Sequence, residues 1–274
     1  MHALFPETFT LTTLPSAQVG IQNTPSPTRE GTTLLNIQNP DSISEDSTPL
    51  PPLPDADVES AYIARCVSHA LTLPNTQATH EAVTQHLKTA NATLFHFTGH
   101  ASYNDKHPQR SALYLSQQER LTVQTLSQLN LSTYELACLS ACETGTTGRE
   151  AFENDYVGIS SAFLAQGVSH VIATLWTVES EASALFMMRF YEQRQHHPHL
   201  SDIVLFNQIQ RWFKQVAYGE LWQWYEAILA GLESDESTIQ PMLVGTLLSR
   251  GKKSPEDSPY SHPYYWAAFT ISGT

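Results

Sequence analysis

Short apolar runs alternate with amphipathic segments along most of the chain. The apolar runs predict buried strands at 33–37, 93–97, 134–141 and 170–176. Apolar residues at helical spacing predict helices at 58–71, 80–90, 156–164, 180–194, 201–217 and 220–232. Strands that alternate with helices indicate a mostly parallel β-sheet with helices on both faces, which is an α/β fold.

Weaker patterns complete this outline. They predict strands at 8–14, 113–115 and 263–271 and a short helix at 122–130. Segments 38–57 and 249–262 are polar and contain several prolines, which predicts exposed loops. No internal repeat is visible, so we expect one domain that spans residues 1–274.

Composition narrows the classes of partner. The formal net charge is −13, which argues against nucleic acids and anionic membranes, because both attract basic surfaces. No apolar run approaches the roughly 18 residues that span a bilayer, and the first residues lack the pattern of a secretory signal. The three cysteines Cys66, Cys138 and Cys142 indicate a reducing compartment rather than a disulfide framework. We therefore expect a cytoplasmic protein.

Two strand-like segments end on reactive side chains. His100 closes one segment and Cys142 closes the other, each next to small or turn-forming residues. In an α/β sheet, ligands bind beyond the carboxyl ends of the strands. An imidazole beside a thiol activates it as a nucleophile, and the backbone N–H groups of Ala101 and Cys142 could stabilise an oxyanion. We expect Gly99 to allow a sharp turn at the end of its strand.

Two other interpretations use the same residues. Free cysteine is among the most buried residue types, so Cys142 and His100 could belong to an ordinary core. With His96 and Cys138 they also supply two imidazoles and two thiols, a set that suits zinc. Residues four positions apart on a strand are separated by about 13 Å, however, which is too far to share one ion. Extended strands therefore predict no metal site.

Five ordered blocks resemble a known family. Their patterns are His-Phe-x-x-His, Leu-Ser-Ala-Cys-x-Thr-Gly, Gly-Leu-x-x-x-Phe-Leu-x-x-Gly, Leu-Trp-x-Val and His-Pro-x-x-Trp-Ala-x-Phe. In this chain they lie at 96–100, 139–145, 158–167 (with Ile159 in place of Leu), 175–178 and 262–269. The chain thereby resembles the CHAT family, caspase-like cysteine peptidases of the clan that also holds caspases, separases and gingipains.

The resemblance implies a caspase-like fold and a cysteine endopeptidase that needs no cofactor. It makes His100 the base and Cys142 the nucleophile, which would form an acyl-enzyme with a protein or peptide substrate. It also implies a regulatory or signalling role and a helical-repeat region or partner, so the chain could be one part of a longer protein. The alternative is a catalytically silent module that uses the same cleft to bind proteins.

The chain departs from the family pattern at two positions near the site. Ala101 replaces a Gly often found after the histidine, and its N–H can still donate. Ser180 stands where many members have an acid that would favour Arg or Lys before the cut, with Glu179 and Glu181 on either side. Further candidates for substrate binding are Trp176, Glu143 and Asp155, which follow the strand ends.

Overall fold

The fold is that of a computed structural model, which describes residues 32–51, 53–89, 91–104, 106–143, 155–231 and 253–273. For Pro54, Cys142, Glu143 and residues 155–157 it describes the backbone alone.

A central sheet organises the molecule. Its main strands lie in the order β2 (His69–Pro74), β1 (Thr33–Gln38), β3 (Leu94–Ser102), β6 (Leu136–Glu143), β7 (His170–Thr174) and β8 (Phe269–Gly273). The first five are parallel, and β8 pairs with β7 in the antiparallel direction. The hairpin of β4 (Ala112–Tyr114) and β5 (Arg120–Thr122) adds to the end of β3.

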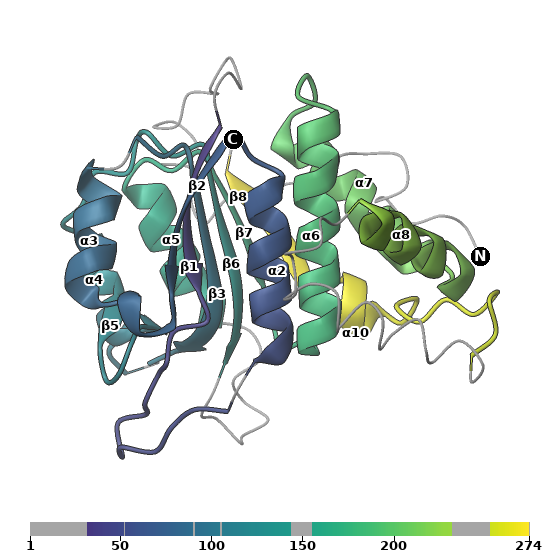
Figure 1. Cartoon of the computed structure of the whole chain (residues 1–274). Helices are drawn as coiled ribbons and strands as arrows, with labels where there is room; N and C mark the ends of the chain where they lie inside the picture. The colour runs from purple at the N-terminus through teal and green to yellow at the C-terminus, as the bar shows by residue number, and fades with distance from the viewer. Residues whose placement is uncertain are drawn as a thin grey trace.

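Helices cover both faces of the sheet (Figure 1). One face carries α3 (His80–Thr89), α4 (Val123–Leu126) and α5 (Asp155–Ala165). The other carries α2 (Pro54–Arg65) and α6 (Ser180–His196), with α7 (Asp202–Gln215), α8 (Tyr218–Ala230) and α10 (Pro263–Trp266) beyond them. Single 3₁₀ turns lie at Asn75–Gln77 and Pro108–Arg110. The predicted class, a mostly parallel sheet with helices on both faces, is confirmed.

Strand alternation divides the core into two layers. On β3, Phe95 and Phe97 belong to the layer under α3 and α5, where the ring of Phe95 lies 5.2 Å from that of Phe163. Leu94, which directly precedes Phe95, belongs to the layer under α2 and α6. Successive side chains on a strand point to opposite faces, so one continuous apolar strand serves both layers.

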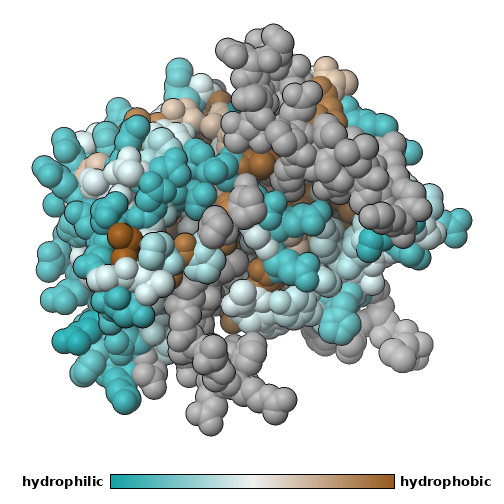
Figure 2. Space-filling model, turned by 60° about the horizontal axis from the view of Figure 1, so that its bottom comes forward, coloured by the Kyte–Doolittle hydropathy of each residue, from teal (hydrophilic) through white to brown (hydrophobic). Residues whose placement is uncertain are grey.

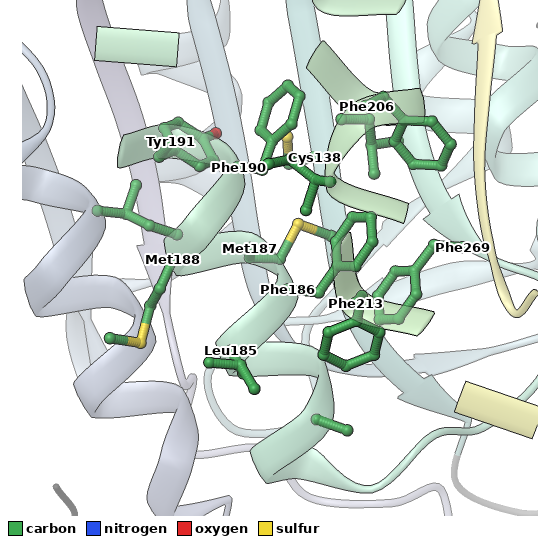
Figure 3. Packing of buried hydrophobic residues seen from close by; sticks show 14 of the residues in the cluster. Cys138, Leu185, Phe186, Met187, Met188, Phe190, Tyr191, Phe206, Phe213 and Phe269 are labelled. Carbon is green, nitrogen blue, oxygen red and sulfur yellow. The ribbon is translucent and has the colours of Figure 1, made fainter. Parts of the chain in front are cut away.

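Helix α6 is buried on nearly all of its sides. Ten of its 17 residues are buried, because it lies between the sheet and α7 rather than at the surface. Phe186 occupies the centre of this layer (Figure 3) and stacks on Phe269 with ring centroids 3.9 Å apart. Phe206 and Phe213 meet the same ring edge-on. A helix that other elements cover over most of its surface belongs to the interior of a domain.

Several predicted boundaries are wrong. The helix expected at 58–71 is α2, which starts at Pro54 and ends at Arg65. Proline in the first turn, followed by Asp55 and Asp57, is a helix-start signal that the sequence reading placed too late. Residues 69–71 of that segment belong to the edge strand β2, because pairing with β1 outweighs their local pattern.

The expected loops and the final strand also need correction. Segment 38–57 is not an exposed loop throughout, since Ser42 and Ala56 are buried and its end is helical. Within 249–262, Tyr260 packs in the core against Phe213 with ring centroids 4.4 Å apart. The strand expected at 263–271 begins with helix α10, and only Phe269 onward pairs with β7.

Other predictions fall at the limits of what is described. The strand expected at 8–14 lies outside the described residues. In the ranges that the structure does describe, no helix is both long enough and apolar enough to span a bilayer.

Phe186→Ala tests the packing of the α6 layer. We expect the free energy of unfolding to fall by about 3–5 kcal/mol, because a fully buried ring is lost from between three other rings. Urea denaturation followed by circular dichroism measures this change. The matched control is Leu71→Ala, whose side chain is 37% exposed on the edge strand and should change stability by less than about 0.5 kcal/mol. Similar losses in both variants would contradict this account of the core.

Candidate active site

The pairing of β3 with β6 brings the two predicted residues side by side. The parallel ladder runs without interruption from Leu94 opposite Leu136 to Ala101 opposite Glu143, and His100 is the register partner of Cys142. Neighbouring strands lie about 4.8 Å apart, and register partners belong to the same face of a sheet. Positions 100 and 142 therefore lie next to each other near the carboxyl ends of their strands, on the face covered by α2 and α6.

Both strands extend further than the sequence suggested. Strand β3 continues through His100 to Ser102, so Gly99 is a strand residue and not a turn. Its missing side chain has a packing reason, because a Cβ atom there would lie 2.9 Å from the ring of Phe97 and 3.1 Å from Pro40. Ala101 is also within the sheet, opposite Glu143 on β6 and Leu113 on β4.

The His100 imidazole is buried and held from one side. Its Nε2 lies 2.9 Å from the carbonyl oxygen of Pro51, which can only accept, so Nε2 carries a proton. Among the described residues, Nδ1 has no hydrogen-bond partner. Burial lowers the pKa of His100 below its usual 6.5, and the Pro51 carbonyl partly opposes this effect. At neutral pH the ring is therefore neutral and presents the lone pair of Nδ1.

Hydrogen bonds tie the segment that carries Pro51 to the sheet and to α2. The backbone N–H of Asn39 donates to the carbonyl of Thr98 at 2.8 Å, next to the end of β3. The Asn39 side-chain amide lies 3.3 Å from the carboxylate of Asp57 and 3.4 Å from the carbonyl of Leu53. The Pro51 carbonyl orients the imidazole and belongs to a segment outside β3 and β6. The contacts of Asn39 hold that segment in place.

A buried polar network lies behind these positions. The carboxylate of Glu59 on α2 accepts from the Ser140 hydroxyl at 2.9 Å and lies 3.0 Å from Nε2 of His96. The same Nε2 lies 2.7 Å from the hydroxyl of Thr98. Ser140 and Thr98 each stand two residues before a predicted catalytic residue, on the same face of the sheet. The network links α2 to the backbone that positions both residues.

Acidic side chains gather at the first turns of α2 and α6. The pKa of Glu181 is raised, first by the crowding of protein atoms around its carboxylate and then by Asp55 and Glu179. The Glu179 carboxylate also lies 3.4 Å from the hydroxyl of Tyr265. The predicted pair Glu179 and Glu181 therefore has a third acidic neighbour, Asp55, which the sequence analysis did not include.

Trp176 is a half-buried side chain that packs against the α6 layer of the core. Its indole N–H donates to the carbonyl of Tyr264 at 2.9 Å. Glu143 and Asp155 are placed by their backbone alone, at the end of β6 and the start of α5. Their role in substrate binding stays a prediction.

Besides Asp55, the structure adds two site residues that the sequence analysis missed. Pro51 acts through its carbonyl oxygen, which no residue-type pattern can reveal. Glu59 did leave a signal, since it precedes Tyr62 and Ile63 by three and four positions and so shares their buried helix face. A carboxylate on an apolar stripe indicates a buried polar partner.

The geometry of the His96 and Cys138 pair also bears on the zinc interpretation. These residues are register partners on extended strands, and Nε2 of His96 is already engaged by Glu59 and Thr98. Within the described side chains, no cluster of three or more His, Cys, Asp or Glu is arranged to hold a metal ion.

Replacing Glu59 tests the buried network. Glu59→Leu leaves the Ser140 hydroxyl and the His96 ring without their carboxylate, so the free energy of unfolding should fall by about 1–3 kcal/mol. Glu59→Gln keeps an acceptor oxygen and should lose less. Urea denaturation compares both variants with Glu45→Leu, a change at an exposed position. An equal effect of Glu59→Leu and Glu45→Leu would show that the network contributes nothing.

Comparison with known proteins places the chain in a family. No curated protein matches it. Two similar solved structures are the Arg-specific cysteine proteinase gingipain R (12% identity, TM-score 0.46) and a complex of the Porphyromonas gingivalis RgpB pro- and mature domains (12%, 0.47). Each match covers 93% of this chain and 50% or 51% of the other, so the chain spans about half of their length. The CHAT domain model matches residues 3–274, and the chain therefore belongs to the CHAT domain family.

Proposed function

We propose that the chain is a cysteine endopeptidase in which His100 and Cys142 form the catalytic dyad. The observation that carries this proposal is the register of β3 and β6, which makes the two residues neighbours at the carboxyl end of the sheet. The orientation of His100 supports it, because Nε2 is held by Pro51 while Nδ1 keeps its lone pair. A base with a fixed tautomer is what activation of a thiol needs.

The reaction then follows ordinary acyl-transfer chemistry. Nδ1 of His100 takes the proton of the Cys142 thiol, and the sulfur attacks the peptide carbonyl carbon. The oxyanion that forms accepts hydrogen bonds from backbone N–H groups, for which Cys142 and Ala101 are the candidates. When the C–N bond breaks, His100 returns its proton to the leaving nitrogen. Water then attacks the thioester carbon and gives a proton to His100. The C–S bond breaks, the acid leaves, and His100 passes its proton to the sulfur to restore the thiol.

The chain contains a second His–Cys register pair, and its burial argues against a catalytic role. His96 and Cys138 lie opposite each other four residues earlier on the same strands, and both are fully buried. Burial also raises the pKa of Cys138, while it raises that of Cys66 to about 12. Neither thiol forms a thiolate readily near neutral pH. Cys142 is the cysteine that we assign to catalysis.

The acidic group at the helix starts suggests the class of substrate. Three carboxylates, those of Asp55, Glu179 and Glu181, lie close enough to influence each other. They would favour a substrate with a positive charge on the acyl side of the cut, and the net charge of −13 favours a basic protein in general. We assign such a peptidase to regulatory proteolysis in the cytoplasm, with a helical-repeat region or partner delivering the substrate.

Substitution of the dyad tests the activity. An electrophilic peptide trap should attach covalently to the native protein at Cys142, and Cys142→Ala should abolish attachment without changing the unfolding curve. His100→Ala should slow attachment by about 100-fold or more, because the general base is lost. Intact-protein and peptide mass spectrometry locate the adduct. Cys66→Ala is the matched control and should react like the native protein. Failure of the native protein to react under reducing conditions would support the silent binding module instead.

The state of His100 predicts an acid limb in the pH profile. Because burial lowers the pKa of His100 below 6.5, the neutral base persists at pH 6.5 and is lost only as the pH falls further. The same residue contributes stability that is complete above pH 6.5 and is lost as the pH falls through the lowered pKa.

The rate of trapping is measured between about pH 4 and pH 8. It should fall as the pH decreases, and the midpoint of this fall should lie below pH 6.5. Circular dichroism at each pH separates loss of the base from unfolding. A midpoint above 6.5 would contradict the burial of His100 as the controlling factor.

A further inference from the structure

A cavity of about 370 Å³ borders the His100 imidazole. Its walls come mainly from the segment that leaves β1, and its apolar lining consists of Pro40, Ile43, Pro49, Leu50 and Pro51. Since a water molecule occupies roughly 30 Å³ of liquid, the cavity has room for a large side chain. Ile43 and Leu50 are only half-buried although they are apolar. These walls would therefore gain from contact with a hydrophobic group.

The strand order fixes the side of the catalytic pair on which this cavity lies. Strand β1 pairs with β3 along one edge, and β6 pairs with β3 along the other. Residues 39–43 continue directly from β1. The cavity therefore flanks His100 on the side opposite to Cys142.

The side on which the cavity lies determines which part of a substrate could enter it. In acyl transfer the sulfur holds the acyl part of the substrate, while the base delivers its proton to the leaving nitrogen. The residues after the cut must therefore pass on the imidazole side of the sulfur. From this geometry we infer that the cavity is a specificity pocket for the residue that follows the cut, and that it selects a large apolar side chain. This inference rests on the proposed peptidase function.

Hydrogen bonds hold the backbone of the segment that leaves β1 and forms the cavity wall. The pocket is therefore formed before substrate binds. The backbone N–H of Ile43 donates to the carbonyl of Gln117 at 2.7 Å, and the backbone N–H of Gln117 donates to the backbone carbonyl of Asp41 at 2.8 Å. The guanidinium of Arg120 donates to the Ile43 carbonyl at 2.7 Å. These bonds hold the backbone and leave the Ile43 side chain available. A rigid pocket loses little freedom on binding, which favours selectivity.

Charge around the cavity adds a second expectation. Among the described lining residues, Asp41 is the one with a carboxylate, and it is exposed. A carboxylate at the rim repels an acidic side chain after the cut. The pocket should therefore rank apolar residues above glycine and glycine above aspartate.

Partitioning of the acyl-enzyme measures this preference. An N-blocked arginine thioester, or the best ester from a scan of acyl residues, loads Cys142, and leucinamide, glycinamide or aspartic acid amide is then added. The amine nitrogen forms a bond to the acyl carbon, the thioester C–S bond breaks, and the amine proton passes through His100 to the sulfur. Mass spectrometry gives the ratio of amide products in each competition. We expect leucinamide to exceed glycinamide by about tenfold or more.

Two variants and a control test the pocket itself. Ile43→Ala should reduce the preference for leucinamide over glycinamide about fivefold, because part of the apolar wall is removed. Ile43→Asp should shift the preference toward lysinamide, which a merely structural role of Ile43 would not produce. Leu71→Ala, on the far edge strand, should leave the native preference unchanged. Unfolding curves confirm that each variant is folded.

The outcomes separate this inference from the function on which it rests. If no ester gives an acyl-enzyme at Cys142, the peptidase assignment fails and the pocket fails with it. If the acyl-enzyme forms but the amines compete equally, or if Ile43→Asp leaves their ranking unchanged, the peptidase stands and the pocket assignment is overturned.

Discussion

The parallel register of β3 and β6 is the constraint on which the rest of the site depends. Side chains on a strand alternate between faces, so a slip of one residue would place His100 and Cys142 on opposite sides of the sheet. The register is secured by its buried neighbours, since Phe95 and Phe97 must face α5 while Leu94 faces α6. The apolar pattern that folds the protein thus also sets the relative position of the two reactive residues.

Polar groups within this apolar sheet restrict the arrangement further. A buried carboxylate is costly unless it is hydrogen-bonded, so Glu59 favours only those packings in which Ser140 and His96 meet it. The Nδ2 group of Asn36 on β1 similarly lies 2.7 Å from the Ser60 hydroxyl on α2. Helix α2 is therefore held against the sheet by directional contacts as well as by hydrophobic packing. These contacts specify one helix position, and that position also places Pro51 against His100.

The sequence predicted the buried strands and the main helices, because both depend on local apolar patterns. It also predicted that His100 and Cys142 are neighbours, because each follows an apolar run of a parallel sheet. It failed where pairing with a distant strand decided the structure, as in β2 and in the late start of β8. It could not identify Pro51, whose role lies in a backbone carbonyl brought near by folding. Asp55 was missed for the same reason, since its acidic neighbours come from another helix.

The burial of α6 on nearly all sides has a consequence for dissecting the molecule. Phe186 contacts Phe206 and Phe213 of α7 as well as Phe269 of the sheet. The helices that follow α6 are therefore not an appendage that could be removed to obtain a smaller folded fragment. A truncation after residue 196 would remove α7 and β8 and expose the apolar side chains of α6 that they cover, so we expect the shortened chain to aggregate rather than fold.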